Sequence, residues 1–138
     1  MKKLLIITTL VLFAGIAFGQ TVQKDKIVSI HEWTVKLKPD VTMNQFLQMW
    51  EEKFTPVVKK VIPEMKPFVI KGVQDTNKYV YAGLYVWDSI DELRKYFNED
   101  GSPTEQGEGP FQELMSLMSE VEKYGEFTYT AYDYIVIQ

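Results

Sequence analysis

The sequence contains no cysteine, and a single one of its 138 residues is a histidine, His31. Without cysteine, the chain has no disulfide framework, no thiol nucleophile and no lipidated-cysteine anchor. One histidine is too few for the paired histidines of common metal-binding motifs. The sequence also lacks a glycine-rich phosphate-binding loop and a nucleophile-elbow motif. Several large classes of enzyme are thereby excluded.

Basic residues are outnumbered. Lys and Arg together count 15 against 19 Asp and Glu, which gives a net charge of −4. Lys2 and Lys3 belong to an N-terminal leader, and without them 13 basic residues face 19 acidic ones, a net charge of −6. No basic stripe is present to neutralise phosphates, so we expect no nucleic-acid partner.

The N-terminus has the pattern of a secretory leader. Residues 4–18 form a mainly apolar run after the two lysines, and Ala17 and Gly19 are small residues near its end. This pattern predicts a signal peptide over residues 1–19 and a single domain over 20–138, exported to the periplasm or the extracellular space. The alternative is an uncleaved membrane anchor, for which the run is short against the ~20 residues of a membrane span.

Residues 78–92, KYVYAGLYVWDSIDE, are the stretch around which the domain is organised. Val and Tyr predict a strand that ends at Trp87. Ser89 lies three residues before Glu92, which is the capping-box spacing at the start of a helix. A half-buried strand therefore leads directly into a helix, with a Trp at the corner.

The rest of the chain supplies partners for this unit. Alternation and helical periodicity predict strands at 27–38, 67–71, 78–87 and 127–137 and helices at 43–61, 90–97 and 111–123. Pro56 lies inside the first helix and is expected to kink it or to split it after Thr55. Residues 98–110, NEDGSPTEQGEGP, read as an acidic surface loop.

This order of elements predicts an α+β fold of the ferredoxin-like βαββαβ type, a four-stranded antiparallel sheet with helices on one face. The other face is then left open. We expect apolar side chains there from Val28, Ile30, Val80, Ala82 and Tyr134. A homodimer that packs sheet against sheet would cover this surface.

Two segments carry a resemblance to a known family. They are residues 33–39, WTVKLKP, which lead into the helix of Phe46, and residues 85–89, YVWDS, which lead into the second helix. In these segments the chain resembles the dimeric α/β-barrel superfamily and, within it, the antibiotic-biosynthesis-monooxygenase-like domains. The resemblance implies a substrate held between sheet and helices, and oxygenation of aromatic molecules without metal or flavin.

A related group in that superfamily degrades haem with an Asn on the first strand, a Trp that ends the third strand and a His on the last helix. Trp87 resembles that Trp, and His31 lies near the Asn position. Near the His position this sequence has Leu114 and Met115. We therefore expect no haem and no other cofactor.

The candidate catalytic residue is His31, acting as a general base, because an imidazole exchanges protons near neutral pH. The alternative is a structural histidine. Candidate ligand-binding residues are Trp87, Tyr85, Trp33, Trp50 and Met115. For these the alternative is ordinary core packing, although Trp87, at a strand end, is expected to face the pocket in part and to contribute less stability than Trp50.

No metal site is expected. Glu99, Asp100, Glu105 and Glu108 lack the regular spacing of a calcium loop, and a solvated acidic loop is the simpler reading. Two functions stay open: a small-molecule-binding protein that resembles cofactor-independent monooxygenases, with isomerisation as a further reaction type, and a non-catalytic ligand-binding or protein-interaction module. A cavity reached by His31 favours the first function, and a core filled by the three Trp residues favours the second.

Overall fold

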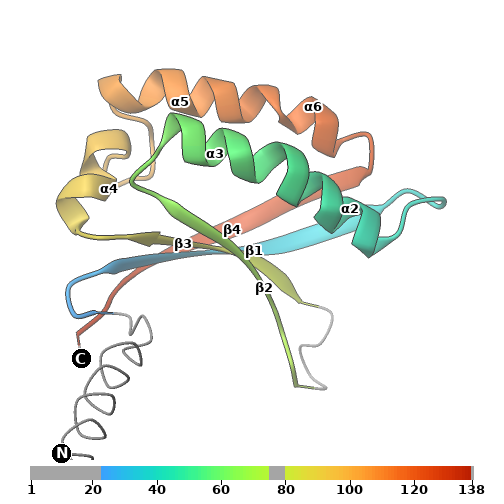
Figure 1. The fold of residues 1–138 in the computed structure, drawn as a ribbon, viewed down its shortest axis with the longest axis horizontal. Helices are drawn as coiled ribbons and strands as arrows, with labels where there is room; N and C mark the ends of the chain where they lie inside the picture. The colour runs from blue at the N-terminus through green and yellow to red at the C-terminus, as the bar shows by residue number, and fades with distance from the viewer. Residues whose placement is uncertain (1–22, 75–79, 138) are drawn as a thin grey trace, which may run out of the picture.

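The computed structural model describes residues 23–74 and 80–137. The predicted signal peptide, residues 1–19, lies outside them. In chain order (Figure 1), the elements are β1 (Ile27–Leu37), α2 (Met43–Met49), the π-helical turn η1 (Trp50–Phe54), α3 (Thr55–Val61), β2 (Lys66–Lys71), β3 (Tyr81–Trp87), α4 (Ile90–Tyr96), α5 (Glu105–Ser116), α6 (Met118–Val121) and β4 (Gly125–Ile135).

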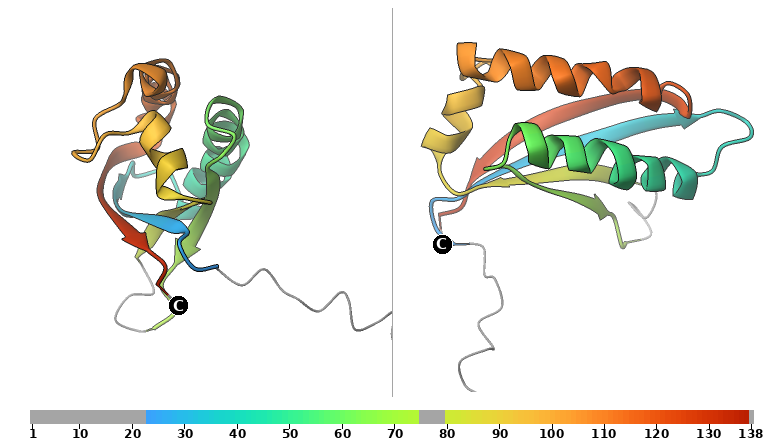
Figure 2. Two further views of the ribbon diagram at one scale, coloured as in Figure 1. Left: turned by 90° about the vertical axis from the view of Figure 1, so that its left-hand side faces the viewer. Right: turned by 45° about the horizontal axis from the view of Figure 1, so that its top comes forward.

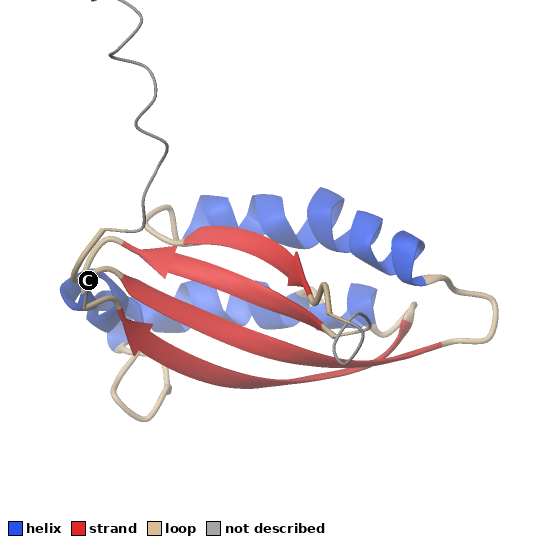
Figure 3. Ribbon diagram, turned by 90° about the horizontal axis from the view of Figure 1, so that it is seen from below, coloured by secondary structure: helices blue, strands red, loops and turns tan. Residues whose placement is uncertain are grey.

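The four strands form one antiparallel sheet in the order β2-β3-β1-β4. The helices lie on one face of this sheet, which the two side views in Figure 2 show. Seen from below, the strands are in front and the helices behind them, so none of the described helices covers the other face (Figure 3). The predicted ferredoxin-like fold is confirmed by this topology.

Strand β1 shows why the sequence alternates as it does. Ile27, Ser29 and Trp33 are buried beneath the helices, whereas Glu32 and Thr34, which point the other way, are exposed. Successive side chains of a strand point to opposite faces, so odd-numbered residues of β1 face the helices. The predicted division of β1 into two faces is correct.

The first helical segment accommodates Pro56 without a break. Thr42 caps its start in a capping box with Gln45. Pro56 has no N–H to donate, and the turn before it is π-helical: the Thr55 N–H donates to the carbonyl of Trp50, five residues back. Backbone angles stay helical at both junctions of this turn. The expected kink or split is thus replaced by one wide turn within a continuous helical segment.

The buried residues form two clusters between the helices and the sheet. One surrounds Trp87 and includes Tyr85, Leu93 and Ile62. The other comprises Trp33, Phe46, Met49, Trp50 and Val121. Phe54, in the π-helical turn, packs against both clusters.

The sequence predicted a loop over the whole of residues 98–110. This prediction is wrong for the second half of the segment, where α5 begins at Glu105. Thr104 caps this helix, its side chain accepting a hydrogen bond from the Gly107 N–H. A Cβ on Gly107 would clash with the carbonyl oxygen of Tyr96, so glycine allows α5 to approach the end of α4 closely. The helical pattern predicted for 111–123 is likewise divided, since α5 ends at Ser116 and α6 follows.

Strand bounds differ by a few residues. Strand β3 begins at Tyr81, so Val80 is not part of it, and residues 78–79 lie outside the described chain. Strand β4 begins at Gly125, two residues before the predicted start at 127. A Cβ on Gly125 would meet the backbone of β1 at Lys36, its close neighbour, which explains the glycine.

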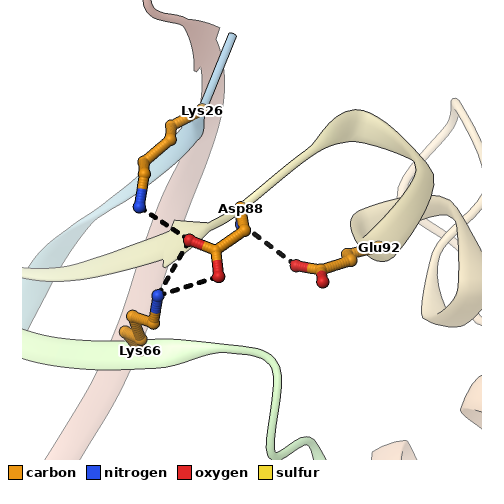
Figure 4. Close-up of polar contacts among 4 residues, drawn as sticks. All are labelled: Lys26, Lys66, Asp88 and Glu92. Atoms are coloured by element: carbon orange, nitrogen blue, oxygen red, sulfur yellow. Dashed lines mark hydrogen bonds and ion pairs between the residues drawn. The ribbon is translucent and has the colours of Figure 1, made fainter. Parts of the chain in front are cut away.

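A surface ion network joins the ends of three strands (Figure 4). Lys26 precedes β1 and Lys66 begins β2, and both donate to the carboxylate of Asp88, which follows β3, at 2.7 and 2.8 Å. The Asp88 N–H donates to Glu92 in α4 at 3.1 Å. The two lysines lower the pKa of Asp88 from 3.8 to about 2. None of the helices in the described residues is long and apolar enough to cross a membrane.

Candidate functional site

The sheet register brings polar residues together on the helix-covered face. Ser29 on β1 lies opposite Tyr85 on β3 and opposite Asp133 on β4. His31, two residues along β1, lies opposite Gly83 and Ala131. Three strands therefore supply this group, with β1 in the middle.

A cavity of about 200 Å³ lies above these residues, between the sheet and the helices. All five predicted ligand-binding residues and His31 line it: Trp87, Tyr85, Trp33, Trp50 and Met115. Its exposed lining residues, such as Met115 and Tyr129, belong to α5, β4 and the 98–101 segment, whereas those from β1, β3 and α3 are mostly buried. The cavity therefore opens along the side between β4 and α5.

His31 sits between two aromatic rings at the floor of the cavity. Its ring contacts Tyr85 edge-on, with centroids 4.7 Å apart, and stacks on Tyr129 at 4.9 Å and an interplanar angle of 2°. Burial lowers the pKa of His31 below its ordinary value of 6.5, and the negative charge of Asp133 offsets part of that shift. The imidazole is therefore neutral at pH 7, the form that accepts a proton.

The contacts of His31 can be compared with those of a purely structural histidine. The ring nitrogens of a buried structural histidine are normally hydrogen-bonded, for example to a Tyr hydroxyl or a backbone carbonyl. Among the hydrogen bonds of the described residues, none uses a nitrogen of His31. The surroundings of the imidazole are ring faces and edges, and its nitrogens keep their hydrogen-bonding capacity.

Ser29 and Asp133 form a direct polar link across the two strands. The Ser29 hydroxyl, which is buried, donates to the Asp133 carboxylate at 2.5 Å. Burial also raises the pKa of Tyr85 well above its ordinary value of 10, so its hydroxyl stays protonated. The Tyr85 ring lies over Gly83, where a Cβ would come within 2.8 Å of the phenol oxygen, so Gly83 makes room for that ring beside His31.

The three Trp residues line the cavity but are also buried. Trp33 and Trp50 contact each other with ring centroids 4.5 Å apart. Trp87 is 1% exposed, against 4% for Trp50, so the expectation that Trp87 is the more open of the two is wrong. The reason is α4, whose Tyr96 packs near the Trp87 ring. In the described residues, the Trp87 Nε1–H is a buried polar group with no hydrogen-bond partner.

Sequence reasoning singled out His31 and Tyr85 but missed Ser29, Tyr129 and Asp133. Ser29 was assigned to the same face as His31, which was correct, but was not considered part of a site. The signal for the other two was the alternation of strand β4, whose odd-numbered residues face the cavity.

Two other regions of the structure are weaker candidates for a site. In the part of the chain that the structure describes, no group of three or more His, Asp or Glu side chains is placed to hold a metal ion. A second, more open hollow of about 560 Å³ is lined by Lys36, Glu126 and the residues around Val121. It contains no His and no Trp among its lining residues, so the cavity at His31 is the stronger candidate.

Comparison with known proteins gives structural matches only. No family model and no curated protein matches the sequence. Among solved structures, the chain is similar to SnoaB, a cofactor-independent oxygenase from Streptomyces nogalater, with a TM-score of 0.43 and 11% identity over 83% of this chain and 95% of that one. A mutant of SnoaB gives a TM-score of 0.44 and 12% identity over 78% and 91%. A dimeric protein of unknown function and ferredoxin-like fold from Bacteroides fragilis gives 0.38 and 16% identity over 78% and 95%.

Proposed function

We propose that this protein binds a small apolar or aromatic molecule in the cavity between sheet and helices, and that His31 accepts a proton from it. The observation that carries this proposal is a neutral imidazole with unengaged nitrogens on the floor of a cavity walled by aromatic rings. A general base works best when its neutral form is present at the working pH. An apolar cavity of roughly 150 Å³ holds benzene, so this one suits a ligand of one or two rings.

The reaction that fits these groups is oxygenation without a cofactor. His31 takes the proton of an acidic phenol, and the resulting anion supplies the electrons that reduce O2. For 1-naphthol, one oxygen atom enters the ring at the para carbon, the other leaves as water, and the product is 1,4-naphthoquinone. Substrate and O2 account for every atom and electron. Isomerisation through the same proton transfer needs no O2.

The test uses 1-naphthol as the probe. Calorimetry measures its binding, and an oxygen electrode with quinone absorbance measures turnover, for the wild type, His31→Gln and the control Thr34→Val on the open face. We expect binding to wild type and turnover that His31→Gln abolishes. Binding without turnover in the wild type supports the second candidate, a non-catalytic ligand-binding protein. Absence of binding to every protein contradicts both.

We also propose a homodimer through the uncovered sheet face. One cross-strand row on that face, Phe68–Leu84–Ile30–Tyr132, is apolar throughout, and Phe68 is 53% exposed. Lys36 and Glu126 form an ion pair further along the face, and Lys66, on the other side of the row, is paired with Asp88. A row of exposed apolar side chains on a sheet face favours a partner that covers it. A second copy of the chain offers the same patch by two-fold symmetry.

Sedimentation at micromolar concentration tests the dimer. We expect twice the chain mass for the wild type, a monomer for Phe68→Lys, and an unchanged dimer for Thr34→Lys, which adds the same charge beside the Lys36–Glu126 ion pair. A wild-type monomer contradicts the homodimer and leaves this face to a different protein, which is the interaction-module alternative.

Export to the periplasm or the extracellular space is likewise proposed, from the leader pattern alone. N-terminal sequencing of the protein from its own host tests it. A chain that begins at Gln20 supports cleavage, whereas a chain that begins at Met1 in the membrane fraction supports an anchor.

A further inference from the structure

The cavity has one charged side chain among the residues that line it. Asp133 is the sole Asp, Glu, Lys or Arg in that lining, and His31, the remaining titratable base, is held neutral. Most other lining residues are aromatic or aliphatic. A ligand therefore meets a single carboxylate at the edge of a mainly aromatic and aliphatic cavity, among the described residues that line it.

Asp133 can contact a ligand while it remains hydrogen-bonded to Ser29. It lies near the start of the cavity's open side, on the edge strand β4, and is exposed, whereas Ser29 beneath it is buried. An ionised carboxylate has about four acceptor sites. The hydroxyl of Ser29 occupies one of them, and this bond fixes the carboxylate in position.

The neighbours of Asp133 on the same strand face favour an aromatic cation. Ala131 and Tyr129 lie on the same face of β4 and also line the cavity. Tyr129 is 51% exposed. An ammonium group gains from the ion pair with the Asp133 carboxylate, and an aromatic ring attached to it gains from contact with the aromatic lining. No Lys or Arg in the lining opposes it.

We propose that the natural ligand of the cavity is a small aromatic amine, bound as its ammonium form with the nitrogen at Asp133 and the ring in the apolar interior. This inference rests on the proposed function, because it assumes that the cavity takes a ligand. It adds the chemical class of that ligand. If the Asp133 carboxylate served only to bind Ser29, replacing it with the amide of Asn would leave the affinity for a cationic ligand unchanged. The affinity of Asp133→Asn therefore tests the proposal.

Three probes that share a phenylethyl group separate the contributions: 2-phenylethylamine, 2-phenylethanol and 3-phenylpropanoate, which are cationic, neutral and anionic at pH 7. Calorimetry at about 150 mM salt measures each against the wild type, Asp133→Asn and Glu126→Gln. The last is the matched control, since it removes the same charge from the same strand on the uncovered face. We expect the wild type and Glu126→Gln to bind the amine at least tenfold more tightly than the alcohol, and the anion most weakly.

Asp133→Asn should bind amine and alcohol within about twofold of each other, with its affinity for the alcohol unchanged. Equal binding of amine and alcohol by the wild type overturns the amine proposal and leaves the cavity's role as a binding site intact. Binding of none of the probes overturns both. Should Asp133→Asn not fold, salt provides a second measurement on the wild type: the preference for the amine over the alcohol should fall between about 150 mM and about 1 M salt, because salt screens an ion pair, and a preference that salt does not change contradicts the proposal.

Discussion

The imidazole of His31 lies flat against the phenol ring of Tyr129, with the ring centroids 4.9 Å apart and the planes within 2° of parallel. Tyr129 is itself half exposed on an edge strand, so it covers His31 from the solvent side. The burial of His31, and with it the lowered pKa, therefore depends in part on a side chain at the surface.

The first prediction concerns this cover. Tyr129→Ala should raise the pKa of His31 towards 6.5, because water reaches the ring and the charged form is no longer penalised by burial. Proton NMR titration of tag-free protein measures it, and the signals need no assignment since His31 is the only histidine. Tyr132→Ala is the control: it lies on the same strand, is also 51% exposed, and points to the opposite face. An unchanged pKa in Tyr129→Ala would show that Tyr129 does not shield His31.

The second prediction concerns the two buried Trp residues. Trp87→Ala and Trp50→Ala should each lower the free energy of unfolding by about 3–5 kcal/mol, because both rings are surrounded by protein. Chemical denaturation measures both. Met115→Ala, a truncation at a half-exposed side chain of the same cavity, should cost less than about 1 kcal/mol. If Trp87→Ala costs less than half as much as Trp50→Ala, the Trp87 ring has fewer protein contacts than its burial indicates.

The third prediction uses two glycines of α5. Gly107→Ala should destabilise the protein by about 1–3 kcal/mol, because the new Cβ meets the backbone of Tyr96 and the helices must move apart. Gly109→Ala meets no atoms beyond its chain neighbours and should change stability by less than about 1 kcal/mol, since the better helix propensity of alanine is offset by the restriction that Pro110 places on the residue before it. Thermal unfolding of the two variants compares the same substitution two residues apart. Equal effects would contradict the close contact between α4 and α5.

The fourth prediction concerns the pH dependence of Asp88. Its pKa is about 2 in the folded protein and 3.8 ordinarily, so its contribution to stability is complete above about pH 4 and is lost as the pH falls towards 2. The ion pairs of Asp88 with Lys26 and Lys66 lie at the surface, so together they contribute less than about 1 kcal/mol to the free energy of unfolding. Asp88→Asn should therefore be slightly less stable than wild type at pH 7 and equally stable near pH 2. Urea denaturation at both pH values measures this, with Asp40→Asn as a control for charge. A difference that persists at pH 2 would assign the effect to something other than the ion pairs.

The fold was predictable from the sequence because local and long-range signals agree. The alternation of β1 placed Ser29, His31 and Trp33 on one face, and Ser89 does cap α4, accepting a hydrogen bond from the Glu92 N–H at 3.2 Å. The start of α5 was not predictable in the same way. Glycine and proline in 105–110 lower helix propensity, and the contact between Gly107 and Tyr96, which permits the helix, is tertiary.

The candidate site was predictable only in part. His31 and Tyr85 follow from the antiparallel neighbours β1 and β3 in this topology. Asp133 and Tyr129 depend on the register of β4 against β1, and a shift of one residue would turn both side chains to the other face. The sequence alone does not determine that register.

The π-helical turn also affects the angular position of the residues that follow it. Phe46, Trp50, Phe54, Val58 and Ile62 are spaced four apart, and on an ideal α-helix each step of four overshoots one turn by about 40°. Four such steps would rotate Ile62 nearly to the opposite side of the helix from Phe46. A turn with more residues rotates less per residue and corrects part of this drift. Phe46 and Ile62, which follows the end of α3, are both fully buried, Phe46 in the cluster of Trp33 and Ile62 in the cluster of Trp87. Deleting one residue from 50–54 would therefore shift the phase of α3, and its apolar side would turn away from Trp87.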